Sequence, residues 1–355
     1  MAHSIVELQQ QAIGLLKKLI QTQSFSKEEH DTHALLTDFL TEKGIPFSSV
    51  QYNIWAKNQY FDDAKPTILL NSHHDTVKPN KGYTRDPFLP SIEDGKLYGL
   101  GSNDAGGCLV SLLVAFVFFY DKKDLAYNII FAASAEEEIS GKGGIELLYP
   151  DLPKIDCAIV GEPTLLDAAI AEKGLLVIDA TAEGKAGHAA RDEGVNALYK
   201  AVDDIQWIKN YSFDKVSPYL GNTKMTVTIL NGGSQHNVVP KECVFTIDIR
   251  LTECYSHEEV IGLLEEKLTS KVKARSTRIK PSFIKESHPL VKAAVKYGAK
   301  TYGSPTTSDQ ALIPATSLKM GPGDSARSHM ADEYIYLKEI EEGVQRYIDV
   351  LSELV

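Results

Sequence analysis

The sequence is poor in cysteine. Its 355 residues include 4 cysteines, and no two of them have the spacing of a CxxC or zinc-finger motif. Cys108, Cys157 and Cys243 lie within apolar runs, where free thiols behave as small hydrophobes. We therefore expect a reducing, cytoplasmic location.

Targeting and membrane-spanning segments are also missing from the pattern. The N-terminal stretch lacks the basic start, apolar block and small-residue cleavage site of a signal peptide. Its apolar residues instead recur at helical spacing, which predicts an amphipathic helix over residues 5–20. The most apolar run, residues 108–120, is about a dozen residues long and too short to cross a bilayer, so we interpret it as a buried helix.

The chain has fewer basic residues than acidic ones. The chain has 37 Lys and Arg against 48 Asp and Glu, a formal net charge of -11. Nucleic acids and anionic membranes are polyanions that bind basic patches, so this balance argues against both and favours a small-molecule partner. No internal repeat, low-complexity segment or long linker is visible. The length exceeds what one hydrophobic core usually supports, which predicts about two domains.

Short apolar runs alternate with helical segments up to residue 173. This pattern predicts an α/β fold with a mostly parallel sheet flanked by helices. The clearest strands, residues 67–70, 128–131 and 157–160, are each followed at once by His, Asp or Glu. Because ligand sites in open α/β sheets gather beyond the carboxyl ends of the strands, we expect these polar residues to meet.

The pattern changes after residue 173. Residues 174–285 are interpreted as an inserted α+β domain, joined by two short crossings, while residues 286–355 complete the first domain with residues 1–173. The expected strands of the insert are 175–181, 224–229 and 243–250, and its helices lie near 194–209 and 257–269. The final part is expected to form a helix (288–302), a strand (315–320) and a closing helix (337–354).

Two acidic motifs follow the first strand. The His-x-Asp spacing puts His73 and Asp75 on one side of an extended chain, so His73 can bind a metal while Asp75 orients it. Asp104 lies among glycines in the stretch 99–107, which allow close approach to a bound group. Asp104 can also serve as the N-cap of the buried helix, and both roles are compatible.

Four further acids and a histidine complete the pattern. The run Glu136-Glu137-Glu138 follows an apolar strand and is costly unless solvated or neutralised by cations. Glu162 follows another strand, and His329 comes shortly after two glycines. Each cluster alone is more simply a solvated loop. Together they form a set of oxygen and imidazole ligands that suits paired zinc, cobalt or manganese ions.

With these motifs, nearly the whole chain resembles the di-zinc family that includes acetylornithine deacetylase and succinyl-diaminopimelate desuccinylase. The family motif Gly-His-x-Asp-Val-Val-Pro stands here as Ser72-His-His-Asp-Thr-Val-Lys-Pro79. The resemblance implies a zinc-exopeptidase-like catalytic domain with an inserted lid and dimerisation domain, two divalent ions, zinc foremost, and a homodimer formed through the lid.

The resemblance also implies residue roles. The implied ligands are His73 and Glu162 for one ion, Glu138 and His329 for the other, and Asp104 as the bridge. Glu137 becomes the general base and Asp75 the support of His73. The family has Asp-Glu-Glu where this chain has Glu136-Glu137-Glu138, which leaves the register open. We assign the base to Glu137 because the paired acids precede Ile139-Ser-Gly141, as in the family.

Three residues of the insert are candidates for substrate contact. His188, in Gly184-Lys-Ala-Gly-His-Ala189, matches the family histidine that donates to the oxyanion from the partner subunit. Arg250 can clasp a carboxylate bidentately or pair with a surface acid, and the resemblance favours the first. Asn237, in the loop 232–240, is implied to reach the substrate. His236 beside it has no family role.

The expected reaction is hydrolysis of an N-acylated amino acid. Two ions can activate one water and polarise the scissile carbonyl, and Glu137 moves the proton. The best single substrate is N-acetyl-L-ornithine, giving L-ornithine and acetate in arginine biosynthesis.

Other substrates and another class of function stay open. N-succinylornithine, N-acyl-citrulline, a dipeptide and the peptide of an aminopeptidase are alternatives. A succinyl group calls for another cation, for which Lys173 and Arg327 are candidates. A non-catalytic metal-binding scaffold is the alternative from a different class, and the presence of Glu137 and all five ligands argues against it.

Overall fold

The computed structural model describes residues 4–355, and the chain divides into two compact units. Unit 1 extends to Ile170 and includes Phe283–Tyr302 and Ser308–Val355, and unit 2 comprises Ala171–Ser282 and Gly303–Thr307. The chain passes between them at 170/171, 282/283, 302/303 and 307/308, so the expectation of two crossings is wrong. The short return of 303–307 has no composition signal that would have revealed it.

A mostly parallel sheet with helices on its faces forms the core of unit 1, which confirms the predicted fold class. The strand order is β1-β2-β6-β3-β7-β19-β8-β17, with β18 on β8, and β6, β3, β7 and β19 run parallel. The bounds are β1 Ser48–Val50, β2 Asn53–Lys57, β3 Thr67–His73, β6 Asn128–Ser134, β7 Cys157–Val160, β8 Ala168–Glu172, β17 Ser282–Phe283, β18 Thr301–Ser304 and β19 Thr316–Lys319. Strands β3, β6 and β7 are buried along their whole length, which explains their unbroken apolar sequences.

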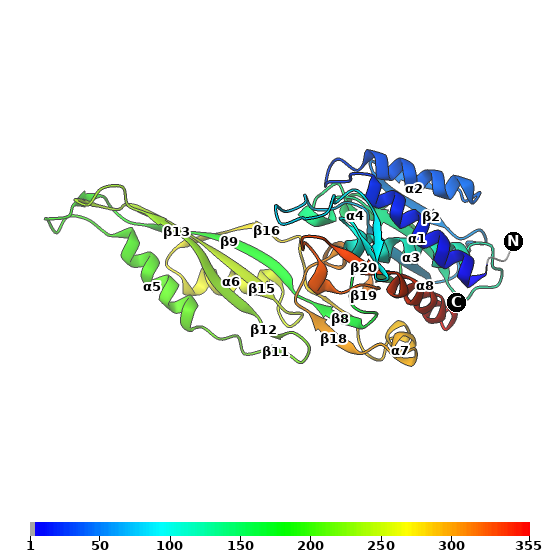
Figure 1. Ribbon diagram of the computed structural model, residues 1–355. Coiled ribbons are helices and arrows are strands. Elements are labelled where there is room, and N and C mark those ends of the chain that lie inside the picture. The colour runs from blue at the N-terminus through cyan, green and yellow to red at the C-terminus, as the bar shows by residue number, and fades with distance from the viewer. Residues whose placement is uncertain (1–3) are drawn as a thin grey trace. The chain divides into compact units, whose positions relative to one another are not determined.

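Helices α1 (Ile5–Gln21), α3 (Gly107–Phe119) and α8 (Leu337–Ser352) pack side by side on one face of this sheet (Figure 1). The predicted amphipathic helix is α1, which begins with a capping box between Ser4 and Glu7. The predicted buried helix is α3. The stretch Ser102–Phe119 is long and apolar enough to cross a membrane by composition, but 83% of it is buried inside the protein.

Two local expectations for unit 1 are wrong. Asp104 is not the N-cap of α3, because Gly106 takes that position and Asp104 lies in a kinked turn, Ser102–Gly106. The helix expected over 288–302 is only α7, Pro289–Lys296. It ends there because Gly298 adopts a left-handed conformation, φ +96°, and the chain then continues as a strand.

The remaining elements of unit 1 are three short strands and two helices. A small sheet has the order β20-β5-β4 and joins distant parts of the chain. The bounds are β4 Ser91–Glu93, β5 Lys96–Tyr98, β20 Tyr334–Tyr336, α2 His30–Glu42 and α4 Ile145–Leu148.

Unit 2 contains a four-stranded antiparallel sheet in the order β13-β15-β9-β16. Residues at alternate positions, including Ile178, Phe245 and Ile247, point into its core, as expected for strands with one buried face. The bounds are β9 Gly174–Glu183, β10 Gly187–His188, α5 Ala197–Asn210, β11 Val216–Ser217, β12 Gly221–Asn222, β13 Lys224–Gly232, β14 Val238–Val239, β15 Glu242–Leu251, α6 His257–Lys267 and β16 Lys271–Ser276.

Candidate metal centre

Three parallel strands of unit 1 end at the same edge of the sheet and deliver polar residues there. His73 is the last residue of β3 and pairs with Ser134, the last residue of β6. Glu137 and Glu138 follow β6 in a single 3-10 turn, Glu137–Ile139. Glu162 follows β7, the neighbour of β3 on its other side. The meeting of strand-end residues expected from the sequence is therefore observed.

The candidate ligands form a continuous chain of contacts. His73 Nε2 lies 3.4 Å from Asp104 Oδ1 and 3.8 Å from Glu162 Oε1. Asp104 turns its other oxygen, Oδ2, toward His329 Nε2 at 3.8 Å. His329 Nε2 in turn lies 2.9 Å from Glu138 Oε2. Asp104 thus stands between two histidine-carboxylate groups.

The chemistry of these donors fits bound cations. His73 Nε2 and Glu138 Oε1 are buried and have no hydrogen-bond partner among residues 4–355, and such atoms are costly unless something satisfies them. Two groups of three donors each lie within ligand distance of one another, and His73 belongs to both. The first contains Asp104 and Glu138, and the second contains Glu137 and Glu162. Imidazole and carboxylate donors of this kind suit divalent metal ions.

The pKa shifts of the candidate ligands also favour bound cations. Burial raises the pKa of Glu162 to about 8, and the charge of Asp104 adds to this effect although His73 opposes it. The hydrogen bond to Glu138 raises the pKa of His329 to about 9 against the lowering effect of burial. Carboxylates gathered in a poorly solvated place repel one another, and divalent cations remove that repulsion.

Asp75 supports the centre in two ways. Asp75 Oδ1 and Oδ2 accept hydrogen bonds from the backbone N–H groups of Glu137 and Glu138, at 3.0 and 3.2 Å. His73 Nδ1 donates to the backbone oxygen of Asp75 at 3.0 Å, and its distance to Asp75 Oδ1 is 3.4 Å. Since Nδ1 carries the hydrogen in the neutral ring, Nε2 is left free to bind an ion. The histidine is therefore oriented by the Asp75 carbonyl as well as by its carboxylate.

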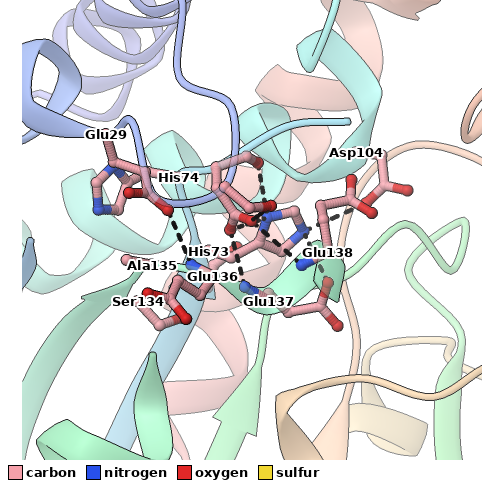
Figure 2. Close-up of polar contacts among 12 residues, drawn as sticks. Glu29, His73, His74, Asp104, Ser134, Ala135, Glu136, Glu137 and Glu138 are labelled. Atoms are coloured by element: carbon pink, nitrogen blue, oxygen red, sulfur yellow. Dashed lines mark hydrogen bonds and ion pairs between the residues drawn. The ribbon is translucent and has the colours of Figure 1, made fainter. Parts of the chain in front are cut away.

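The three consecutive acids point in different directions (Figure 2). Glu136 has a left-handed backbone, φ +53°, and its Oε2 accepts the N–H of Gly143 at 3.2 Å. A Cβ at Gly143 would collide with this carboxylate, which explains the glycine. Glu137 Oε2 instead lies 4.0 Å from His73 Nε2, and Glu138 reaches His329. The geometry thus separates Glu136 from the other two acids.

Sequence reasoning missed three buried carboxylates beside the centre. Glu29 is fully buried, and its Oε1 accepts the N–H of Glu136 at 3.1 Å (Figure 2). Asp309 Oδ2 accepts hydrogen bonds from Asn71 Nδ2 at 2.8 Å and Ser134 Oγ at 2.5 Å. Glu333 holds the backbone around Asp104. Nothing in the sequence distinguishes these acids from solvated ones, because their burial comes from distant segments.

The candidate residues of the insert belong to unit 2. His188 and Asn237 are exposed and lie close together, since β10 pairs with β14 and Ala189 N–H donates to Asn237 O at 2.9 Å. Arg250 forms a two-pronged pair with Asp248 on its own strand, at 2.9 and 3.1 Å.

Of the two cations considered for a succinyl group, Arg327 belongs to unit 1. It pairs with Glu339 through both terminal nitrogens, at 2.6 and 2.7 Å, and its guanidinium stacks on Tyr334 and Tyr336. Because Glu339 already balances its charge and takes a hydrogen bond from each terminal nitrogen, Arg327 is a poor candidate for a substrate anion.

Solved structures share this fold at low sequence identity. Aminopeptidase PepT from Bacillus cereus matches with a TM-score of 0.76 and 18% identity, covering 98% of each chain. A dinuclear metal binding peptidase of family M20 from Bacillus subtilis matches with a TM-score of 0.74 and 14% identity, covering 97% of each chain. An M20 family metallo-carboxypeptidase from Sulfolobus solfataricus matches with a TM-score of 0.70 and 19% identity, covering 97% of this chain and 98% of that one. Residues 69–353 also match the sequence pattern of one family, and the chain therefore belongs to peptidase family M20/M25/M40.

Proposed function

We propose that this protein is a two-metal amidohydrolase that removes the acyl group from an N-acylated amino acid. The position of Asp104 carries the proposal, because its two oxygens face His73 and His329 at 3.4 and 3.8 Å. Ions in two-metal sites lie roughly 3.5–4 Å apart, so a carboxylate that faces both histidines suits a bridging ligand. Glu162 would complete the ligands on the His73 side and Glu138 those on the His329 side.

Glu137 is the proposed general base. When bound, two divalent ions would polarise the scissile carbonyl and make water more acidic. Burial raises the pKa of Glu137 well above its usual range, aided by nearby Glu162 and Asp309 and opposed by His73. Asp75 holds the Glu137 backbone N–H at 3.0 Å and so limits where the carboxylate can go. Glu137 takes the proton from the attacking water and passes it to the leaving amine nitrogen.

His188 is the proposed donor to the developing oxyanion. Its Nδ1 accepts the backbone N–H of Ala190 at 3.1 Å, so in the neutral ring the hydrogen sits on Nε2. An exposed Nε2–H is the group that a substrate oxygen would need. Arg250 and Asn237 are the proposed contacts to the substrate, with Arg250 exchanging Asp248 for a substrate carboxylate.

A homodimer formed through unit 2 is part of the proposal. Strand β13 is at the edge of its sheet, and its Ile229 and Leu230 side chains are about half exposed. Tyr199, on the adjacent helix α5, is 72% exposed. An edge strand beside exposed apolar side chains favours association with another chain. Sedimentation velocity across a range of concentrations tests this, and a monomer at every concentration would contradict it.

N-acetyl-L-ornithine is the proposed substrate, with L-ornithine and acetate as products in the cytoplasm. The motifs around His73, Glu137 and His188 support a deacylase. Peptide substrates are the second candidate, supported by the family to which the chain belongs and by the aminopeptidase and carboxypeptidase among the similar structures.

A substrate panel decides between these candidates. Protein loaded with zinc or cobalt is assayed for amine release from N-acetylornithine, N-succinylornithine, N-acetylcitrulline and a set of dipeptides, with Glu137→Gln protein as the control. We expect the highest kcat/KM on N-acetylornithine. A higher value on dipeptides would establish the peptidase instead. No turnover of any compound by protein carrying two ions would overturn the proposed hydrolase function.

A further inference from the structure

Glu333 is a buried carboxylate that holds the loop carrying Asp104. Its side chain is 2% exposed. Glu333 Oε1 accepts the backbone N–H groups of Asn103 and Asp104 at 2.8 and 2.9 Å, and Oε2 accepts that of Gly101 at 2.9 Å. The backbone oxygen of Glu333 also accepts the N–H of Gly99 at 3.0 Å. One side chain thus satisfies three backbone donors of the loop in which Asp104 lies.

The segment that carries His329 is fastened to the same loop at its other end. Asn103 Nδ2 donates to Asp324 O at 3.1 Å, and Asp324 N–H donates to Asn103 Oδ1 at 3.0 Å. His329 lies between these two attachments, at Asp324 and Glu333. Its side chain is 56% exposed, and besides the contact with Glu138 its backbone oxygen accepts a hydrogen bond from Asn80 Nδ2 at 3.0 Å.

A carboxylate is the side chain that this position requires. Two oxygens with several lone pairs can accept three N–H groups, whereas an amide presents one oxygen and one NH2 group that is only a donor. Glutamine at position 333 would therefore turn a donor toward at least one buried backbone N–H of residues 101, 103 and 104. The loop would have to move to restore a partner, because a buried N–H without one is costly.

We propose that Glu333 is a positioning residue that sets the separation between Asp104 and His329, and thereby the affinity for the ion held by Asp104, Glu138 and His329. The inference rests on the two-metal function proposed above. His73 and Glu162 are held by β3 and by the residues after β7, whereas the side chain of Glu333 bonds to the backbone of residues 101–104. The ion on their side should therefore be affected less. Loss of a partner that orients a ligand commonly reduces metal affinity about 10–100-fold.

The test is a titration of metal-free protein with Co2+, in which binding is measured by calorimetry and by the visible absorption of the bound ion. Wild type is compared with Glu333→Gln and with Asp204→Asn as a matched control. Asp204 is also a buried carboxylate that accepts backbone N–H groups, from Thr269 and Ser270 at 2.9 Å each, but it lies in unit 2. We expect Glu333→Gln to reduce the affinity for the Co2+ ion on the His329 side at least about tenfold more than the affinity for the ion on the His73 side. The absorption spectrum of the bound Co2+ should also change. Asp204→Asn should lower the melting temperature without changing either affinity.

Two outcomes separate this inference from the proposed function. Wild type that binds fewer than two Co2+ ions would overturn the two-metal proposal and this role with it. Equal affinities in wild type and Glu333→Gln would overturn only the role of Glu333. If Glu333→Gln does not fold, Asn103→Ala serves as the second variant, because it removes the other attachment of the same loop. It must selectively reduce the affinity for the Co2+ ion on the His329 side. Unchanged binding in Asn103→Ala would then refute the inference.

Discussion

Replacing Glu137 and Glu136 separately by glutamine distinguishes proton transfer from metal binding. Glu137 Oε2 lies 4.0 Å from His73 Nε2, farther than the oxygens of Asp104 and Glu162 at 3.4 and 3.8 Å. Removing its charge therefore leaves the nearer carboxylates in place. The Glu136 carboxylate bonds to Gly143 N–H instead, and a glutamine oxygen can still accept that bond.

The expected losses differ by orders of magnitude. A positioned general base contributes about 10²–10⁴ in rate, or roughly 3–5 kcal/mol of transition-state stabilisation. Glu137→Gln should lose kcat by that factor with KM little changed. It should also keep a normal melting temperature, because the change removes a buried charge that Glu162 and Asp309 disfavour. Glu136→Gln should change kcat less than about threefold and stability by no more than about 1 kcal/mol.

The assay combines steady-state kinetics on N-acetylornithine with metal analysis of each variant by mass spectrometry. Both variants should retain two ions per chain. If Glu137→Gln keeps only one, then Glu137 is a ligand, as its place beside His73 and Glu162 also allows, and the assignment of the base is wrong. If Glu136→Gln loses as much activity as Glu137→Gln, the register of the three acids is wrong.

Three further predictions follow from the same geometry. Removal of metal by a chelator should abolish activity and lower the melting temperature, because free ion at 100 times its Kd stabilises the native state by about 2.7 kcal/mol per site. An unchanged melting temperature, with loss of metal verified, would argue against ions held by the folded protein. If His188 acts across a dimer, mixing inactive His188→Ala and Glu137→Ala proteins should restore part of the activity, and failure after confirmed subunit exchange would contradict a shared site. Arg250→Lys should raise KM about tenfold and leave kcat nearly unchanged, because lysine cannot give a substrate carboxylate the two-pronged contact that Arg250 makes here with Asp248. A fall in kcat alone would place Arg250 outside substrate binding.

The elements near the centre could be predicted because their burial leaves a direct mark on the sequence. Strands β3, β6 and β7 are buried on both faces, so each reads as an apolar run that stops where the polar residues begin. Helix α3 was visible for the same reason. The helix predicted after His288 is longer than the observed one, because a glycine in a helical pattern can either continue or end a helix. Only the left-handed backbone of Gly298 shows that it ends one here.

The supporting acids could not be predicted. Glu29, Asp309 and Glu333 bond to residues that are distant in the sequence. Glu29 and Glu333 accept backbone N–H groups, which nearly every residue carries, and Asp309 accepts the side chains of Asn71 and Ser134. An acid on a surface loop and an acid buried beside a metal centre have the same local sequence. The distinction depends on what packs over each one, and this information is spread over the whole chain.

By itself, the sequence determined which residues can bind a cation and where they stand along the chain, because donor type and strand ends are local properties. The tertiary structure decided the geometry between them. It placed the two oxygens of Asp104 toward two different histidines, turned Glu136 away from its neighbours, and fastened the His329 segment to the Asp104 loop through Glu333 and Asn103. Those arrangements depend on contacts between residues up to 232 positions apart, and only the packed chain brings such segments within hydrogen-bonding distance.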